Sequence, residues 1–256
     1  MTRVVKIGGR AQADARLATL IRDAWLASPG ELCLVHGGGD EISAMQRAIG
    51  RESAFVGGRR VTAEGDLELL RMVLSGIVNK RLVNELVTVG VPAVGISGED
   101  AALIRAEVID FASLGYAGRP VGINVKVLRT LMSGGYLPVV SPVAYNATEG
   151  LGGTLNVNGD DAAAAIAAAL GADELLLIAD VEGVRSSAAD LIPILHNDSV
   201  RELISNGTAG GGMAAKLESA LAALASGVGL VRICDIDGLV EADRGTSIAQ
   251  SQSVAT

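Results

Sequence analysis

Short apolar runs alternate with longer amphipathic segments along this chain. The runs occupy residues 4–5, 32–35, 93–96, 137–140, 175–179 and 230–234. Short apolar runs of this length are typical of buried strands, and the segments between them are long enough for helices. The alternation therefore predicts an α/β fold with a mostly parallel sheet covered by helices.

Two of the intervening segments have helical periodicity. Apolar residues recur three or four positions apart in the first, which ends near Pro29-Gly30, and in a second that runs from about residue 66 to residue 86. The residues predicted to face the core are Leu17, Leu20, Ile21 and Ala24 in the first helix, and Leu70, Val73, Leu74 and Ile77 in the second.

The composition indicates one globular unit over residues 1–256. Of these residues 49% are hydrophobic and 20% are charged, which is too apolar for a disordered chain. The formal net charge is −8 and the basic residues form no blocks, so neither nucleic acid nor an anionic membrane surface is expected as a partner. The most apolar segment, residues 162–170, is too short to span a bilayer, which needs about 20 residues.

The two cysteines, Cys33 and Cys234, both lie in apolar runs. Their number and spacing imply neither a metal site nor a disulfide, and the first residues enter a strand pattern without a secretion signal. These features predict buried thiols in a cytoplasmic protein that has no resident metal.

Glycine clusters lie at predicted junctions of strands and helices, where open α/β sheets bind ligands. The clusters are Gly8-Gly9, Gly37-Gly38-Gly39 and Gly210-Gly211-Gly212. Backbone N–H groups at such a turn can converge on a phosphate. A tight turn without a ligand is the commoner explanation of one cluster taken alone, and neither the Walker pattern nor the dinucleotide fingerprint is present.

Several polar residues occupy positions that favour a ligand. Lys6 lies inside the first strand, where an ammonium is costly unless it ends at a polar site, and Lys216 lies near a helix start, where a cation favours an anionic partner. Asn156 and Asp160 point the same way in an extended segment, and Arg60 could bind a carboxylate through two hydrogen bonds. The alternatives are solvated surface positions and, for Asn156 to Asp160, a helix N-cap.

In their order along the chain, these residues resemble the successive motifs of the amino-acid kinase family, and in particular of its N-acetylglutamate kinases. The matching motifs are Lys6-Ile7-Gly8-Gly9, His36-Gly37-Gly38-Gly39, Gly58-Arg59-Arg60-Val61-Thr62, Asn79-Lys80, Asn156-Val157-Asn158-Gly159-Asp160, Asp180-Val181-Glu182-Gly183-Val184, Gly212-Met213-Ala214-Ala215-Lys216 and Gly245-Thr246-Ser247-Ile248. The resemblance implies a three-layer αβα sandwich. About residues 1–170 would bind an acylated amino acid and form a dimer, and about residues 171–256 would bind ATP.

The resemblance also implies a reaction, the phosphorylation by ATP of the side-chain carboxylate of N-acetyl-L-glutamate in arginine biosynthesis. Lys6 and Lys216 would stabilise the transferring phosphoryl group, and Asp160 would hold both lysines. The acceptor site would include Gly38, Gly39, Arg60 and Asn156, and the ATP site Gly8, Gly9, Asp180, Val181, Gly183, Val184, Gly210, Gly212 and Met213. Mg²⁺ would arrive with ATP. An acceptor carboxylate is ionised at neutral pH, so the reaction needs no general base.

Two positions depart from the family pattern. Arg59 occupies a position that is usually apolar, and Ala63 follows Thr62 where aspartate is common. The added guanidinium leaves a more acidic acceptor open, such as N-succinylglutamate or carrier-linked aminoadipate. A non-catalytic sensor on the same fold is the alternative from another class, and the presence of both lysines argues against it. The Arg60-Val61-Thr62 sequence argues against carbamate, uridylate and glutamate 5-kinases.

The chain start carries an expectation about assembly. Only five residues precede Lys6, too few for two turns of helix, whereas arginine-inhibited relatives carry an N-terminal helix that joins dimers into a hexamer. The resemblance therefore predicts a homodimer with little sensitivity to arginine.

Overall fold

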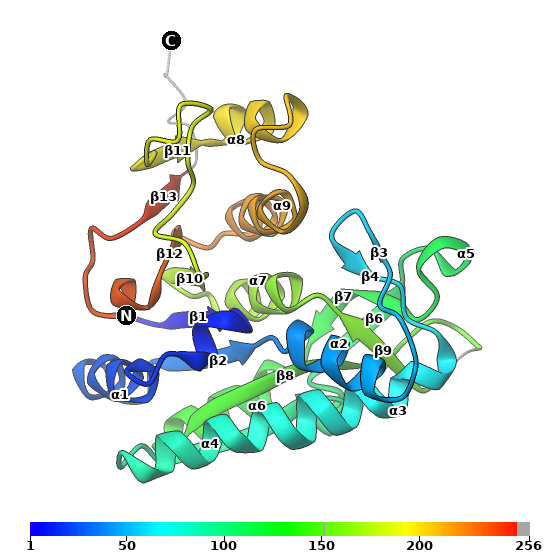
Figure 1. Ribbon diagram of the computed structural model, residues 1–256. Helices are drawn as coiled ribbons and strands as arrows, with labels where there is room; N and C mark the ends of the chain where they lie inside the picture. The colour runs from blue at the N-terminus through cyan, green and yellow to red at the C-terminus, as the bar shows by residue number, and fades with distance from the viewer. Residues whose placement is uncertain (151, 250–256) are drawn as a thin grey trace.

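One large sheet forms the centre of the protein. The computed structural model describes residues 1–150 and 152–249, and over these ranges the strands form an 11-stranded sheet and a separate hairpin. The order is β11-β13-β12-β10-β1-β2-β8-β6-β7-β9, with β5 beside β8 (Figure 1). Among the described pairings of this sheet only β6–β7, β8–β9 and β12–β13 are antiparallel. The mostly parallel sheet is thus confirmed.

The strand bounds match the apolar runs closely where the strands are central. The sheet strands are β1 (Arg3–Ile7), β2 (Leu32–His36), β5 (Ala93–Gly98), β6 (Ile104–Val108), β7 (Ala117–Ile123), β8 (Leu137–Asn146), β9 (Thr154–Val157), β10 (Glu174–Ile178), β11 (Ile194–His196), β12 (Leu230–Cys234) and β13 (Thr246–Ala249). The hairpin consists of β3 (Phe55–Val56) and β4 (Arg59–Arg60).

Helices cover both faces of the sheet, which makes the predicted three layers. Val4 and Val5 alternate along β1, and each belongs to a different core: Val4 packs in the cluster that contains α7 and α9, and Val5 in the cluster that contains α1 and α4. The helices are η1 (Arg10–Ala13), α1 (Leu17–Ala27), α2 (Gly39–Ala48), η2 (Glu64–Asp66), α3 (Leu67–Leu70), η3 (Arg71–Val78), α4 (Asn79–Thr88), η4 (Asp100–Ala102), α5 (Phe111–Leu114), α6 (Val125–Ser133), α7 (Gly159–Leu170), α8 (Asn197–Ser205), α9 (Gly211–Ala225) and η5 (Ile236–Leu239). Within the described ranges none of them has the length and apolar content to cross a membrane.

The second predicted helix contains an irregularity that the sequence pattern missed. Its middle part, η3, is a π-helix, so its turns hold more residues than the turns of an α-helix. The prediction was therefore wrong for Ile77, which is 47% exposed, while Val78 is fully buried. Leu70, Val73 and Leu74 are buried as predicted.

The topology brings three loops to one edge of the sheet. β2 and β10 flank β1 as parallel neighbours, so Gly8-Gly9, Gly37 to Gly39 and Ala179 to Val181 follow strand ends that lie side by side. The third glycine cluster departs from the expected strand-to-helix junction, because it follows α8 and starts α9. The common edge is where an open α/β sheet binds ligands.

Candidate active site

Two lysines from opposite ends of the chain meet at one carboxylate. Lys6 Nζ lies 2.9 Å from Asp160 Oδ1, and Lys216 Nζ lies 3.0 Å from the same oxygen. Lys6 comes from β1, Asp160 from the first turn of α7, and Lys216 from α9. The three side chains are 11%, 8% and 10% exposed, in that order. The predicted contacts of Asp160 with both lysines are therefore present, in a site nearly closed to water.

The cluster contains two ammoniums and one carboxylate. Burial alone would raise the pKa of Asp160, but the charges of Lys6 and Lys216 lower it well below its usual range. The pKa of Lys216 is lowered to about 8, first by burial and then by Lys6, with Asp160 opposing the shift. The uncompensated positive charge favours an anionic group at this point, as a phosphoryl group would be.

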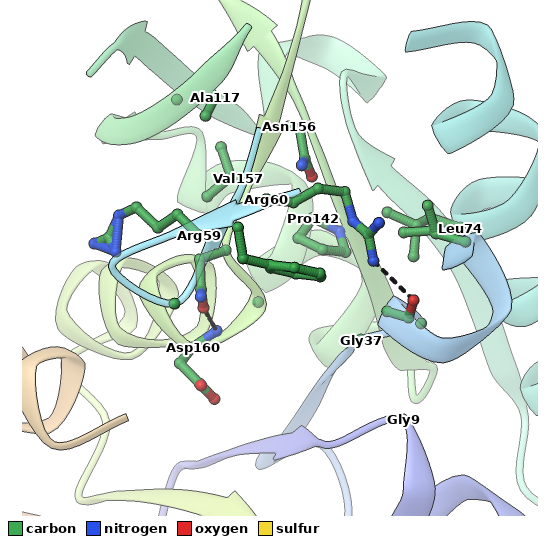
Figure 2. Close-up of a pocket in the computed structure, with 18 of the residues that line it drawn as sticks. Gly9, Gly37, Arg59, Arg60, Leu74, Ala117, Pro142, Asn156, Val157 and Asp160 are labelled. Atoms are coloured by element: carbon green, nitrogen blue, oxygen red, sulfur yellow. Dashed lines mark hydrogen bonds between the residues drawn. The ribbon is translucent and has the colours of Figure 1, made fainter. Parts of the chain in front are cut away.

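A cavity of about 220 Å³ opens on one side of the lysine cluster (Figure 2). Gly38, Gly39, Arg60 and Asn156, the four residues predicted for the acceptor, all line it. Much of the remaining wall is apolar, formed by Ile42, Phe55, Leu74, Ile109, Ala117, Pro142 and Val157. The cavity thus combines a polar end with an apolar wall, as small-molecule sites do.

Arg60 is, with Lys6, a buried cation of this cavity wall and is only 7% exposed. Its Nη1 donates to Gln46 Oε1 (2.8 Å) and Ser53 Oγ (2.6 Å), and its Nη2 donates to the Gly39 carbonyl (2.8 Å) and Ser43 Oγ (2.9 Å). All four acceptors are neutral. Burial lowers the pKa of Arg60. A buried guanidinium held by neutral groups favours an anionic ligand, since a charge away from water needs a counter-charge.

Asn156 lies at the same wall, on β9. Its Nδ2 donates to Thr62 Oγ1 at 2.9 Å. Thr62 lies in the segment that follows β4, so this hydrogen bond fixes the orientation of the Asn156 amide. Asn158 has the alternative role considered for this series: its side chain accepts from the Asp160 N–H and caps α7. The three alternating polar residues therefore have different roles: Asn156 lines the cavity, Asn158 caps α7, and Asp160 is the carboxylate of the lysine cluster.

Arg59 and Arg60 extend from β4 in opposite directions (Figure 2). Neighbouring residues of a strand point to opposite faces, so only one of them can face α2. Arg59 Nη2 forms an ion pair of 2.7 Å with Asp161 Oδ2, and Asp161 accepts a second hydrogen bond from Ser219. The added guanidinium is thus held by a carboxylate of the chain itself.

A second cavity, of about 550 Å³, lies on the other side of the lysine cluster. It shares Lys6, Asp160, Gly9 and Gly39 with the first cavity. Of the residues predicted for ATP, those that line it are Gly8, Gly9, Asp180, Val181, Gly212 and Met213. The Gly8 N–H donates to the Ile178 carbonyl at 3.1 Å, so Gly8 contributes mainly by lacking a side chain.

Three residues predicted for ATP lie outside that lining. Gly210 precedes α9 as its N-cap residue. Val184 is buried, and its N–H donates to Thr246 Oγ1 at 2.8 Å. A Cβ at Gly183 would meet the side chains of Leu191 and Thr246 at 2.7 Å, so glycine there is explained by packing against them. Residues 183–184 of this motif therefore pack in the protein interior and do not line the second cavity.

His36, directly before the glycine turn, ends β2 and is fully buried. Its Nε2 lies 3.1 Å from Asn79 Nδ2, and its Nδ1 lies 2.9 Å from the Gly37 carbonyl. Burial lowers its pKa to about 4, so the ring is neutral at physiological pH. Through its contact with the Gly37 carbonyl, His36 supports the glycine turn.

The cysteines are free thiols and both are buried. Burial raises the pKa of Cys33 and that of Cys234 to about 12. Over residues 1–150 and 152–249, no group of three or more His, Cys, Asp or Glu side chains is arranged to hold a metal ion.

The chain is similar in sequence to proteins of a known family. The sequence profile of the amino acid kinase family matches residues 1–235. The chain belongs to the amino acid kinase family. It is 46% identical over 235 residues to the acetylglutamate kinase of Cereibacter sphaeroides strain ATCC 17029, which covers 91% of this chain and 79% of that protein. It is 40% identical over 242 residues to the acetylglutamate kinase of Roseiflexus castenholzii, covering 94% and 92%.

Solved structures place this amino acid kinase among similar folds. The smu.665 protein of Streptococcus mutans superposes with a TM-score of 0.87 at 31% identity, over 97% of this chain and 98% of the other. Carbamate kinase from Giardia lamblia superposes with a TM-score of 0.75 at 16% identity, over 98% of both chains, and shows the fold alone.

The amino acid kinase site also contains residues that the sequence did not single out. Arg10 follows the first glycine turn and lines the second cavity, where it pairs with Asp180 (2.7 Å) and Asp40 (3.5 Å). Gln46, Ser43 and Ser53 surround Arg60. The one signal for this group is a polar residue, Gln46, on the buried face of α2.

Proposed function

We propose that this chain transfers the γ-phosphoryl group of ATP to the side-chain carboxylate of N-acetyl-L-glutamate, as a step of arginine biosynthesis. The observation that carries the proposal is the Lys6–Asp160–Lys216 cluster between two cavities. One cavity holds a buried arginine suited to a carboxylate, and the other opens on glycine turns suited to phosphates. The relatives named acetylglutamate kinase support the choice of acceptor.

The reaction follows from these positions. An ionised carboxylate oxygen of the acceptor forms the new O–P bond as the bond from the γ-phosphorus to the bridging oxygen breaks, and ADP leaves with that electron pair. Lys6 and Lys216 neutralise charge on the equatorial phosphoryl oxygens, which is the main task of a protein in phosphoryl transfer. Asp160 fixes both ammoniums. Gly9, Gly38 and Gly39 offer backbone donors from the two turns, and Mg²⁺ enters with ATP as part of the substrate.

On the acceptor side, Arg60 and Asn156 bind the α-carboxylate and the adjoining amide. A carboxylate is a stronger acceptor than a neutral hydroxyl, so it can replace Ser43 or Ser53 at the guanidinium. The acetyl group suits the apolar wall better than a succinyl group would. The succinyl carboxylate, a third carboxylate in the acceptor, would need its own cation, and Arg59 is already paired with Asp161.

The division into two halves is part of the proposal. Every residue that lines the first cavity lies between Lys6 and Asp160, which supports acceptor binding by about residues 1–170. Residues 178–181, Gly212, Met213 and Lys216 line the second cavity and not the first, which supports ATP binding by about residues 171–256. A sensor without catalysis would need only the cavities, and the buried lysine pair favours the enzyme.

We also propose a homodimer formed through the first half and located in the cytoplasm. Met72 and Ile77 are 59% and 47% exposed on η3, beside a hollow lined by Ala44, Met45, Ala48 and Val73. An exposed apolar face of this kind favours a protein contact. The free thiols Cys33 and Cys234 fit a reducing compartment.

A coupled assay of ADP release tests the function. Purified protein with MgATP is offered N-acetylglutamate, N-succinylglutamate, glutamate, N-acetylaminoadipate, carbamate and UMP in parallel. We expect the highest kcat/KM with N-acetylglutamate. Activity restricted to carbamate or UMP would refute the proposal, and preference for N-succinylglutamate would move it to the alternative acceptor.

A further inference from the structure

The β3–β4 hairpin is held in large part by side-chain contacts. It pairs with no strand of the large sheet in the described ranges, and Gly57 and Gly58 form its turn with φ of 55° and 74°. An isolated two-stranded hairpin has marginal stability. Backbone hydrogen bonds of Thr62 with Leu114 and Tyr116 anchor the segment that follows β4, and the rest of the hairpin is positioned by what its side chains bind. Arg60 ties one face to α2, as described above. The other face carries Arg59.

The opposite face of the hairpin is tied to α7 and α9. Arg59 pairs with Asp161 at 2.7 Å, and Asp161 Oδ1 accepts from Ser219 Oγ at 2.6 Å. The pair is largely shielded from water, since the two side chains are 23% and 14% exposed. The turn itself is also close to α9: a Cβ added at Gly58 would meet the Gly211 carbonyl at 3.2 Å and the Ala215 Cβ at 3.3 Å.

The first turn of α7 makes a second connection to α9. Asp160 and Asp161 are consecutive, and they reach Lys216 and Ser219, which lie three positions apart on one face of α9. The carboxylate that holds the hairpin is thus the neighbour of the carboxylate that holds the lysines. Any shift of the hairpin through Arg59 acts on the helix that positions Lys216.

We propose that Arg59, Asp161 and Ser219 form a latch that couples the acceptor cavity to α9, with Arg59 as a positioning residue. This proposal depends on the proposed function only for the identity of the two ligands, N-acetylglutamate and ATP. When the acceptor orders the hairpin through Arg60, the latch holds α9 and Lys216 in place for phosphoryl transfer. Nucleotide binding and acceptor binding then favour each other, because both stabilise the same arrangement.

The first test needs no substrate. Hydrogen exchange at residues 55–62 is compared among the wild type, Arg59→Leu, Asp161→Asn and the double variant. Arg22→Leu serves as control, since among the residues that the structure describes Arg22 pairs only with the adjacent exposed Asp23. We expect exchange in the hairpin to rise roughly fivefold or more in each latch variant, equally in the double variant, and to be restored in part by Arg59→Lys. Unchanged exchange would overturn the latch.

The second test measures coupling. The affinity for ADP is determined by calorimetry with and without saturating N-acetylglutamate. We expect the acceptor to tighten ADP binding at least severalfold in the wild type and in Arg22→Leu, and this factor to fall towards one in Arg59→Leu, together with a higher acceptor KM and a lower kcat. If the acceptor still tightened ADP binding in a variant whose hairpin exchanges faster, the Arg59–Asp161 contact would hold the hairpin only locally. That result would overturn the proposal. If the wild type does not bind N-acetylglutamate, the proposed function fails, while the exchange test still judges the latch.

Discussion

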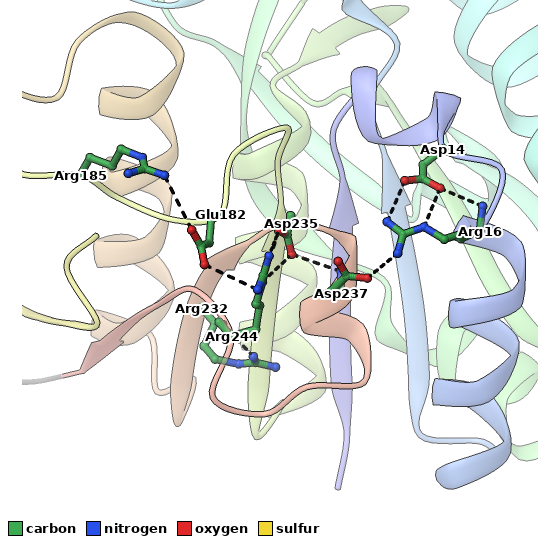
Figure 3. Close-up of polar contacts among 8 residues, drawn as sticks. All are labelled: Asp14, Arg16, Glu182, Arg185, Arg232, Asp235, Asp237 and Arg244. Carbon is green, nitrogen blue, oxygen red and sulfur yellow. Dashed lines mark hydrogen bonds and ion pairs between the residues drawn. The ribbon is translucent and has the colours of Figure 1, made fainter. Parts of the chain in front are cut away.

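Two clusters of acidic and basic side chains in this protein lie in opposite settings. The first is the buried lysine cluster of Lys6, Asp160 and Lys216. The second, which we call the loop cluster, joins the segments that follow β1, β10 and β12 (Figure 3). Its members are Asp14, Arg16, Glu182, Arg185, Asp235, Asp237 and Arg244.

The clusters differ in burial and in charge balance. In the loop cluster, acids and arginines alternate, and Arg244 is about one-third exposed while Arg16 is 59% exposed. Water screens such pairs, and each contributes little. In the lysine cluster one carboxylate faces two ammoniums away from water. Exposed alternating charges therefore tie loops together, whereas a buried excess of one sign indicates the place of a ligand.

The largest effect is expected in the lysine cluster. Lys6→Ala and Lys216→Ala should each lower kcat about a hundredfold or more, because each removes a charge aimed at the transferring group. KM for either substrate should change less. Lys126→Ala, at an exposed position on α6, is the matched control and should keep the wild-type kcat. Wild-type turnover in either test variant would remove that lysine from the reaction.

A smaller effect is expected at Arg60. Arg60→Ala should raise the KM for the acceptor roughly tenfold or more, since a carboxylate bound in ground and transition states alike affects KM. The KM for ATP should stay nearly constant. Steady-state kinetics with each substrate varied in turn measures both. An unchanged acceptor KM would show that the α-carboxylate binds elsewhere.

The burial of Lys216 predicts a pH dependence. Its pKa is lowered from 10.5 to about 8, so the free enzyme loses this ammonium as the pH rises through about 8. The kcat/KM for ATP should therefore fall above pH 8, by up to about tenfold per pH unit, because this parameter reports the free enzyme. Lys216→Arg should move the fall to higher pH, since a guanidinium keeps its proton. A profile with the same fall in Lys216→Arg would assign it to another group.

The smallest effect is expected in the loop cluster. Arg244→Ala removes pairs with Asp235 and Glu182, but the three side chains are 33%, 24% and 37% exposed, so water partly screens these pairs. The thermal midpoint should fall slightly at low ionic strength, and the difference from the wild type should shrink as salt is added. A large loss of kcat in this variant would contradict the distinction between the two clusters.

Periodicity predicted the fold where strands are central and helices are regular. The six apolar runs correspond to β1, β2, β5, β8, β10 and β12. No predicted run marks β11 and β13 at one end of the strand order, or β6, β7 and β9 at the other, because these strands are short or partly exposed. The π-helical turn at Ile77 could not be predicted, because its pattern differs from that of an α-helix by a single residue.

Some site residues could be predicted from the sequence and others could not, because several contacts of the site join residues that are far apart in the chain. Lys6, Asp160 and Lys216 stand in motifs whose order carried the resemblance, and they meet in space. The partner of Arg59 lies 102 positions away on α7, and no local spacing connects the two. The same holds for Gln46 beside Arg60, which depends on how α2 packs against the hairpin.

The most direct test of the central claim is to trap the product. Acyl phosphates react with hydroxylamine to give hydroxamates, so the protein is incubated with MgATP, N-acetylglutamate and hydroxylamine, and hydroxamate and ADP are measured together. The transfer of a phosphoryl group to a carboxylate oxygen predicts one hydroxamate for each ADP, and loss of both in Lys6→Ala. ADP release without hydroxamate would show that water or another acceptor takes the phosphoryl group, and would contradict the proposed reaction.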